Sequence, residues 1–101
     1  MKSIHDWDTL HAVCAAAFGF PDFYGRNGDA FIDCLSYLDE GDGMSRFVLK
    51  PGETLTVELS NAAEFADRAP EQAAALLSWI GAVNAWYVED GKPPMLVVIP
   101  L

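Results

Sequence analysis

The sequence predicts an α/β fold in which helices pack against a small parallel sheet. Residues 6–18, 27–38 and 70–89 carry apolar side chains at three- and four-residue steps, the periodicity of amphipathic helices. Residues 54–59 are rich in β-branched residues and residues 95–99 form a short apolar run, and both patterns are typical of strands. Because helices separate these strands along the chain, we expect parallel pairing through right-handed crossovers.

The N-terminal part is expected to hold a very short strand followed by a helix. Residues 2–4 are the candidate strand. The helix spans residues 6–18, because Asp6 is a good N-cap and the apolar residues after it have helical spacing. Gly19 suits the position just past the C-terminus of this helix, and Pro21 cannot continue it.

The second helix is predicted to begin at Asn27, a good N-cap, and to end near Leu38. Its buried face consists of Phe31, Cys34, Leu35 and Leu38. Its opposite face carries Asp29, Ile32, Asp33 and Ser36. The two aspartates lie one turn apart, where like charges weaken a helix, and only Asp29 is close enough to the N-terminus to be favoured by the helix dipole. Such a pair suits a positively charged partner, and a solvated helix face is the alternative.

The middle of the chain is predicted to be less regular. Residues 39–43 form an acidic loop that contains glycine, and residues 46–50 form a short strand. The dipeptide at residues 51–52, Pro-Gly, signals a turn before the better strand at residues 54–59.

Two helices and a strand complete the predicted fold. Asn61 followed by Glu64 indicates a capping-box-like start of a short helix, which must end near Pro70. Pro70 suits the first turn of the last helix, which runs to about Glu89. The buried stripe of that helix is expected to be Ala73, Leu76, Leu77, Ile80, Val83 and Tyr87. Residues 95–99 are a continuous apolar run, which indicates a strand buried on both faces.

Composition limits the kind of ligand. The chain has 101 residues, 51% of them hydrophobic, and we expect one domain covering residues 1–101. Its 15 acidic and 6 basic residues give a net charge of −9 at pH 7. This charge argues against nucleic acid and anionic membranes as ligands, because both attract Lys and Arg. It favours a basic protein partner and salt-sensitive association, although acidity also keeps a protein soluble.

The sequence also bears on location and metals. It shows no secretion signal, and no apolar run reaches the ~18 residues of a membrane span, so we expect a cytoplasmic protein. In that reducing compartment Cys14 and Cys34 are expected to be buried thiols rather than a disulfide. His5 and His11 match no zinc-binding spacing with them, and no phosphate-binding glycine loop is present, so no metal and no cofactor are expected.

Residues 20–35, with the sequence FPDFYGRNGDAFIDCL, are the most informative segment. They resemble the signature of the barstar family, intracellular protein inhibitors of the ribonuclease barnase. The matching positions are Phe23, Tyr24, Gly25, Asn27, Asp29, Ala30, Phe31, Asp33, Cys34 and Leu35. The resemblance implies a barstar-like fold, with a three-stranded parallel sheet packed with about four helices. It also implies a binding protein rather than an enzyme, with a small basic ribonuclease of extracellular or toxin type as the partner.

The resemblance further implies how the partner is bound. The loop before the second helix and the acidic face of that helix would plug the ribonuclease active site. Asp33 would take the place of a substrate phosphate, and Asp29 would face the basic rim. Within the loop we expect Tyr24 to be buried, Phe23 to be exposed, and Gly25 to have a positive φ or a partner close to its backbone. The predicted partner-binding residues are Phe23, Gly25, Asn27, Asp29, Ile32, Asp33, Ser36 and Tyr37.

Several positions depart from the barstar pattern. Phe23 stands where barstar has a tyrosine, and Ile32 and Leu38 stand where it has tryptophans. The glutamate that the family uses on its last helix has no evident counterpart, and residues 39–52 are longer than the corresponding barstar segment. The particular ribonuclease therefore stays open. The alternatives are an interaction or immunity protein for another basic protein or toxin, and an acid–base hydrolase that uses the two aspartates of the second helix.

Arg26 and the aromatic residues of the last helix are expected to have structural roles. Arg26 either bridges to Asp22 or Asp29, which would orient the loop, or is solvated. The aromatic residues Trp79, Trp86 and Tyr87 are expected to pack in the core or at the edge of the sheet.

Overall fold

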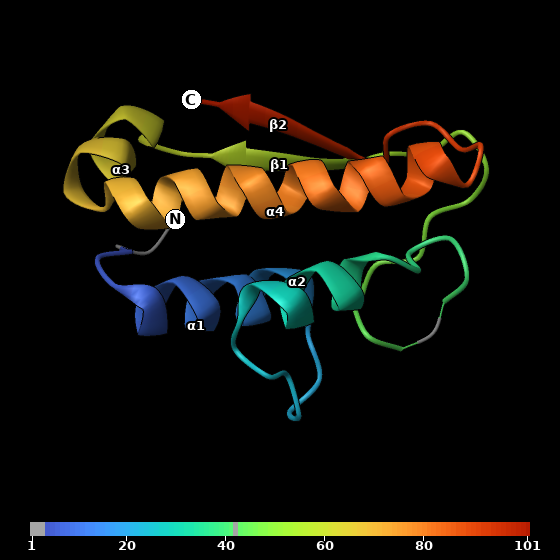
Figure 1. Cartoon of the computed structure of the whole chain (residues 1–101), viewed down its shortest axis with the longest axis horizontal. Coiled ribbons are helices and arrows are strands. Elements are labelled where there is room, and N and C mark those ends of the chain that lie inside the picture. The colour runs from blue at the N-terminus through green and yellow to red at the C-terminus, as the bar shows by residue number, and fades with distance from the viewer. Residues whose placement is uncertain (1–3, 42) are drawn as a thin grey trace.

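The computed structural model describes residues 4–41 and 43–101, and in this part of the chain it has the helices and strands of an α/β fold (Figure 1). The elements in chain order are α1 (Trp7–Phe18), α2 (Gly28–Leu35), β1 (Leu55–Leu59), α3 (Ala62–Arg68), α4 (Pro70–Glu89) and β2 (Leu96–Pro100). In Figure 1 the strands, α3 and α4 form one half of the molecule, and α1 and α2 form the other half.

The sheet of the described residues consists of β1 and β2, which pair in parallel from Leu55 opposite Leu96 to Leu59 opposite Pro100. The crossover through α3 and α4 confirms the predicted parallel connection. The expected third strand is not found in this part of the chain, and the candidate strand at residues 2–4 lies outside the described residues except for Ile4.

The prediction of a strand at residues 46–50 is wrong, and the backbone hydrogen bonds show why. The amide of Arg46 donates to the carbonyl of Phe18 at 3.0 Å, and the amide of Leu49 donates to the carbonyl of Leu38 at 2.8 Å. Both acceptors lie at or beyond the ends of helices α1 and α2. The segment therefore bonds to the C-terminal ends of the two helices α1 and α2 instead of joining the sheet.

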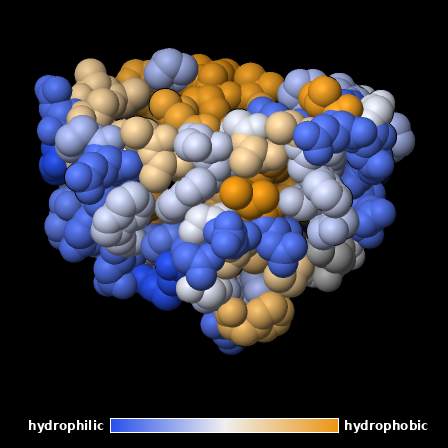
Figure 2. Space-filling view, in the orientation of Figure 1, coloured by the Kyte–Doolittle hydropathy of each residue, from blue (hydrophilic) through white to orange (hydrophobic). Residues whose placement is uncertain are grey.

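The predicted burial of the last strand on both faces is also wrong. Leu96 is buried, whereas Val97 and Ile99 are 42% and 40% exposed. Exposure thus alternates along β2, as in a strand with one covered face. In Figure 2 hydrophobic residues gather along the upper edge of the molecule, where Figure 1 places the strands.

Caps at the helix ends agree with the sequence for α1 and α2. Asp6 accepts from the amide of Thr9 at 2.8 Å, and Gly19 closes α1 in the left-handed region with φ 69°. The side-chain oxygen of Asn27 accepts from the amide of Ala30 at 2.8 Å and begins α2. This helix ends at Leu35 rather than near Leu38, because the Tyr87 hydroxyl bonds the backbone groups at its C-terminus. The Tyr87 hydroxyl donates to the Leu35 carbonyl at 2.6 Å and accepts from the Leu38 amide at 2.9 Å.

The predicted capping box of α3 is wrong. Asn61 has φ 55° and makes no side-chain cap bond. The amide of Ala62 instead donates to the carbonyl of Leu101 at 3.2 Å, so a backbone carbonyl just after β2 supplies the acceptor. In α4 Pro70 occupies the first turn as predicted, but Leu77 is 51% exposed and lies outside the buried stripe.

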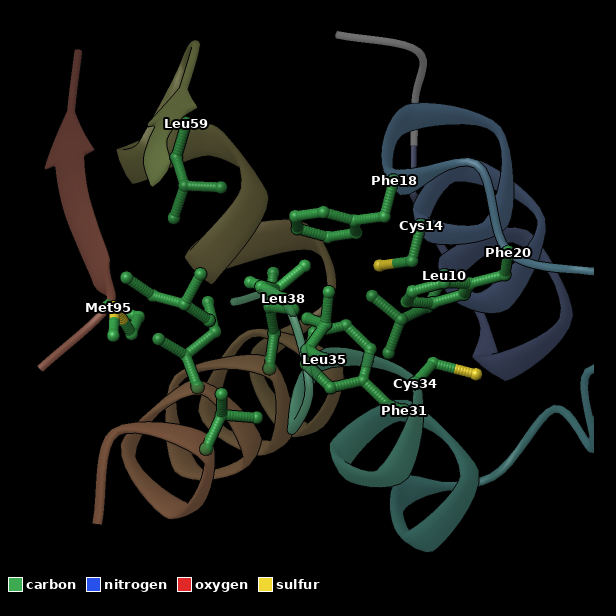
Figure 3. Close-up of a cluster of buried hydrophobic side chains, with 14 of the residues drawn as sticks. Leu10, Cys14, Phe18, Phe20, Phe31, Cys34, Leu35, Leu38, Leu59 and Met95 are labelled. Carbon is green, nitrogen blue, oxygen red and sulfur yellow. The ribbon is translucent and has the colours of Figure 1, made fainter. Parts of the chain in front are cut away.

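The core lies between the two halves of the molecule (Figure 3). The side chains of Leu10, Phe18 and Phe31, which come from α1 and α2, point toward Leu59 of β1 and toward Met95. Cys14 and Cys34 are both buried thiols rather than halves of a disulfide, as predicted. Burial raises the pKa of Cys14 to about 12, so this thiol stays protonated and unreactive at neutral pH.

Candidate partner-binding surface

The loop before α2 is held to α1 by a buried polar contact and presents an aromatic side chain outward. The Tyr24 hydroxyl lies 2.7 Å from His11 Nδ1, and Tyr24 is 8% exposed. Phe23 is 73% exposed, and the loop tip in Figure 2 is correspondingly hydrophobic. Burial lowers the pKa of His11 and favours the neutral imidazole, whose Nδ1 accepts from or donates to the Tyr24 hydroxyl according to the tautomer. The expected burial of Tyr24 and exposure of Phe23 are confirmed.

Arg26 fastens the same loop at a second point. Its guanidinium donates to the backbone carbonyl of Asp8 at 2.9 Å and also forms a salt bridge with the Asp8 carboxylate. Arg26 itself has φ 54°, a conformation that non-glycine residues adopt infrequently. Arg26 was expected either to bridge to Asp22 or Asp29 or to be solvated. Both alternatives are wrong, because the loop folds back onto the first turn of α1 and brings Asp8 to the guanidinium.

Gly28 brings the start of α2 close to α4, a contact that the sequence did not predict. A Cβ atom at Gly28 would lie 2.5 Å from Nε1 of Trp79. The Trp79 ring also stacks on His11, with ring centroids 5.5 Å apart. Gly25 differs, because its φ is not positive and a Cβ atom there would lie 3.4 Å from Ala30 Cβ. The expectation of a positive φ at Gly25 is therefore wrong, and the alternative that a partner lies close to its backbone stays a prediction.

The outward face of α2 carries the two predicted carboxylates. Asp29 and Asp33 are both exposed, and Ile32 between them is half-buried. Neither aspartate forms a salt bridge within the described part of the chain. Ser36 is only 6% exposed, and its hydroxyl donates to the Ile32 carbonyl at 2.6 Å. The helix therefore presents two carboxylates that have no counter-ion among the described residues, and the Ser36 hydroxyl is engaged in holding the helix end.

A surface hollow lies beside this face, between α2 and α4. Its volume is 250 Å³, and it is lined by Asp29, Ile32, Asp33, Ser36, Tyr37 and Trp86. Five of the eight predicted partner-binding residues meet here, whereas Phe23, Gly25 and Asn27 lie on the preceding loop and at the helix N-cap. In Figure 2 hydrophilic residues gather in the lower half of the side of the molecule in view, where Figure 1 places α2.

Trp86 is the residue of this hollow that the sequence analysis missed. It was expected in the core or at the edge of the sheet, but it is 44% exposed. Its indole N–H donates to the Ser36 carbonyl at 3.0 Å, and its ring meets the Tyr37 ring at 72° with centroids 5.8 Å apart. The available signal was its position one turn beyond Val83, beside the buried stripe of α4, where a large side chain reaches the neighbouring helix.

These features define a small α/β protein that displays an acidic helix face beside an exposed aromatic loop tip. The sequence matches the family described as "Barstar (barnase inhibitor)" over residues 1–99, and the chain therefore belongs to the barstar family. Proteins of this family are inhibitors that bind ribonucleases. A comparison with curated proteins found no match. None of the helices in the described residues is both long and apolar enough to cross a membrane.

Proposed function

We propose that this protein inhibits a small, basic, barnase-type ribonuclease by covering its active site with the outward face of α2 and the preceding loop. The observation that carries the proposal is the pair Asp29 and Asp33, which are exposed on a capped helix and form no salt bridge within the described residues. The helix is fixed from beneath by its buried face, so the carboxylates are held in place before a partner arrives.

The chemistry of a ribonuclease site explains why carboxylates would bind there. Such a site holds a phosphate and therefore presents Arg, Lys and protonated His groups around a concave surface. A carboxylate offered from a helix satisfies those donors through short, charge-assisted hydrogen bonds. We assign Asp33 to the phosphate position and Asp29 to the basic rim. The inhibitor offers no phosphodiester bond to cleave, so its occupancy of the site is unproductive.

The remaining predicted residues would surround this charged centre. Phe23 offers an exposed ring at the loop tip, and Gly25 in the same loop is exposed. Asn27 caps α2 and is itself exposed, while Ile32 and Tyr37 line the hollow beside the carboxylates. Ser36 contributes through its position in the hollow, because its hydroxyl is bonded to the Ile32 carbonyl. A hydrophobic rim of this kind excludes water and strengthens the ionic contacts at the centre.

The net charge of −9 would steer the inhibitor toward a basic enzyme and speed association at low salt. We further propose that it acts in the cytoplasm of the cell that makes the ribonuclease, as an immunity protein. The hydrolase alternative has little support in the hollow, because its polar side-chain groups besides Asp29 and Asp33 are the hydroxyls of Ser36 and Tyr37 and the indole N–H of Trp86. Those of Ser36 and Trp86 are engaged by backbone carbonyls.

Inhibition of a panel of small basic bacterial ribonucleases tests the proposal. We expect stoichiometric inhibition of at least one enzyme, with affinity that falls steeply between low and moderate salt. Asp33→Ala is expected to abolish most of the inhibition. Asp67→Ala on α3 is the matched control, because it removes an exposed helix carboxylate away from the hollow. If the chain captures another basic protein or toxin and inhibits none of the ribonucleases, the interaction-protein alternative replaces the proposal.

A further inference from the structure

The hollow between α2 and α4 combines two kinds of chemical group. Asp29 and Asp33 supply carboxylates from α2, and Trp86 and Tyr37 supply aromatic rings from α4 and from the residues that follow α2. Aromatic faces and carboxylates both attract cations, but through different contacts. A ring attracts a cation through its quadrupole, whereas a carboxylate accepts hydrogen bonds from it.

The aromatic side of this hollow is held in place by contacts within the protein. The Trp86 indole N–H donates to the carbonyl of Ser36 at 3.0 Å, and the Tyr37 ring packs edge-on against the indole. Trp86 nevertheless stays 44% exposed. Because the bond to Ser36 fixes the indole while part of its surface stays in water, little side-chain freedom is lost when a ligand stacks on it.

No cation of the described residues occupies the hollow. Lys92 bonds Asp39 at 2.7 Å and Asp90 at 3.0 Å, and these carboxylates raise its pKa. Arg26 is engaged by Asp8, and Arg68 Nε donates to the Ile4 carbonyl at 2.9 Å. Because no Lys or Arg of the described residues lines the hollow, this arrangement is open to a positively charged side chain from another molecule.

The combination of groups distinguishes between the two common cationic side chains. A guanidinium is planar, stacks on aromatic rings, carries several N–H donors and is more weakly hydrated than an ammonium, so it can use both kinds of group at once. We propose that Trp86 is a specificity-determining residue of this surface, and that it makes the hollow prefer an arginine side chain of the partner over a lysine. This inference rests on the proposed function, in which the outward face of α2 binds a basic protein.

Titration of the isolated protein with two small probes tests the inference without the partner. N-acetyl-argininamide and N-acetyl-lysinamide are added separately at low salt, and the indole N–H signals are followed by NMR. Trp7 is the internal control, because it is also 44% exposed but lies on α1. We expect the arginine probe to shift the Trp86 signal in a saturable way and the Trp7 signal hardly at all. We expect the lysine probe to bind about two- to fivefold more weakly, the contribution of one exposed cation–π contact.

Variants separate the aromatic and ionic contributions. Trp86→Leu is expected to reduce binding of the arginine probe, followed through the Tyr37 ring and the α2 amides, by about two- to fivefold and to remove the preference over lysine. Trp86→Phe keeps a ring but loses the bond to Ser36, and it is expected to restore part of that preference. Asp33→Asn is expected to weaken both probes, whereas Asp67→Asn on α3 leaves both unchanged. The amide spectrum of each variant reports whether it is folded.

The outcomes distinguish this inference from the proposed function. Equal shifts at Trp7 and Trp86, equal affinity for the two probes, or unchanged arginine binding by Trp86→Leu would overturn the inference. If any of these results accompanies full inhibition of a ribonuclease, the proposed function stands without the arginine hollow. If the arginine probe binds at Trp86 and no ribonuclease is inhibited, the inference stands and the proposed function fails.

Discussion

The two faces of α2 differ in what the rest of the molecule does with them. On the inner face Phe31 and Leu35 are 0% exposed and Cys34 is 2% exposed, and all three belong to the core. On the outer face Asp29 and Asp33 are exposed and form no salt bridge within the described residues. Residues only two positions apart, Phe31 and Asp33, therefore lie in the core and in solvent respectively.

This contrast shows how a short helix can present a rigid charged surface. An isolated helix of eight residues is unstable in water, so α2 depends on the packing of its inner face and on its end contacts. Asn27 fixes its start, and the Tyr87 hydroxyl bonds the carbonyl of Leu35 at its end. Because the stability of the helix does not depend on the side chains of the outer face, these side chains can serve in binding. Substitutions on the inner face should thus change stability, and those on the outer face should change binding.

The largest effect is expected on the inner face. Phe31→Ala removes a fully buried ring that contacts Phe18, Phe20 and Trp79. We expect the free energy of unfolding to fall by about 3–5 kcal/mol, because both transfer energy and packing are lost. Denaturant unfolding measures this loss. Leu77→Ala on α4 is the control, since Leu77 is 51% exposed and its truncation should cost far less. Similar losses in the two variants would contradict the core position of Phe31.

The next effect is expected on the outer face and in a different measurement. Asp33→Ala should weaken binding to the proposed ribonuclease partner by at least about tenfold, the contribution of one hydrogen bond to a charged group. Its free energy of unfolding should stay the same or rise by about 0.2–0.5 kcal/mol, because the repulsion from Asp29 one turn away is removed. Calorimetric titration and denaturant unfolding on the same sample give both values. A clear loss of stability with unchanged binding would reverse the assignment of this face.

Local signals were sufficient to predict much of this arrangement. The N-caps at Asp6 and Asn27, the left-handed position of Gly19 and the two faces of α2 depend on residues within one or two turns of each other. Capping and helical periodicity are short-range effects, so a sequence displays them directly. The acidic pair Asp29 and Asp33 was found in the same way, and its exposure agrees with the predicted outer face.

The features that the sequence did not display depend on contacts between distant segments. Trp86 bonds the carbonyl of Ser36, which is 50 positions earlier in the chain, and Arg26 bonds Asp8, which is 18 positions earlier. The segment of residues 46–50 looks like a strand, but its amides bond the ends of helices instead of a neighbouring strand. In each case the partner is chosen by the tertiary arrangement, and local propensity contains no information about it.

A smaller effect is expected at Gly28, where the first residue of α2 lies against α4. Gly28→Ala would place a Cβ atom 2.5 Å from Trp79 Nε1, so the ring or the helix must move. We expect a loss of about 1–3 kcal/mol in the free energy of unfolding, together with weaker ribonuclease binding as Asp29 shifts. Gly81→Ala on α4 is the matched control, because no described atom beyond its chain neighbours and the nearby backbone of its own helix lies within 4 Å of the added methyl group. The control should gain about 0.5–1 kcal/mol, since alanine is the better helix former. A gain in both variants would contradict the close contact at Gly28.

The smallest effect is expected from the buried contact between His11 and Tyr24, which holds the loop that carries Phe23. Burial lowers the pKa of His11 below its ordinary value of 6.5, so the folded protein takes up this proton less readily than the unfolded chain. The contribution of neutral His11 to the free energy of unfolding is therefore complete above pH 6.5. The free energy of unfolding should decrease as the pH falls below that value, by at most about 1.4 kcal/mol per pH unit. Denaturant unfolding between pH 5 and pH 7 measures this slope.

The double variant His11→Phe/Tyr24→Phe is the control for this slope. It removes both partners of the 2.7 Å contact and leaves no buried polar group unpaired. His5 is exposed and stays in both proteins, and the pKa of Asp6 lies below 3.8, outside the pH range of the experiment. We expect the slope between pH 5 and pH 7 to be shallower in the double variant than in the wild type. Equal slopes would show that His11 does not link protonation to folding, and the loop would then depend on the Arg26–Asp8 contact instead.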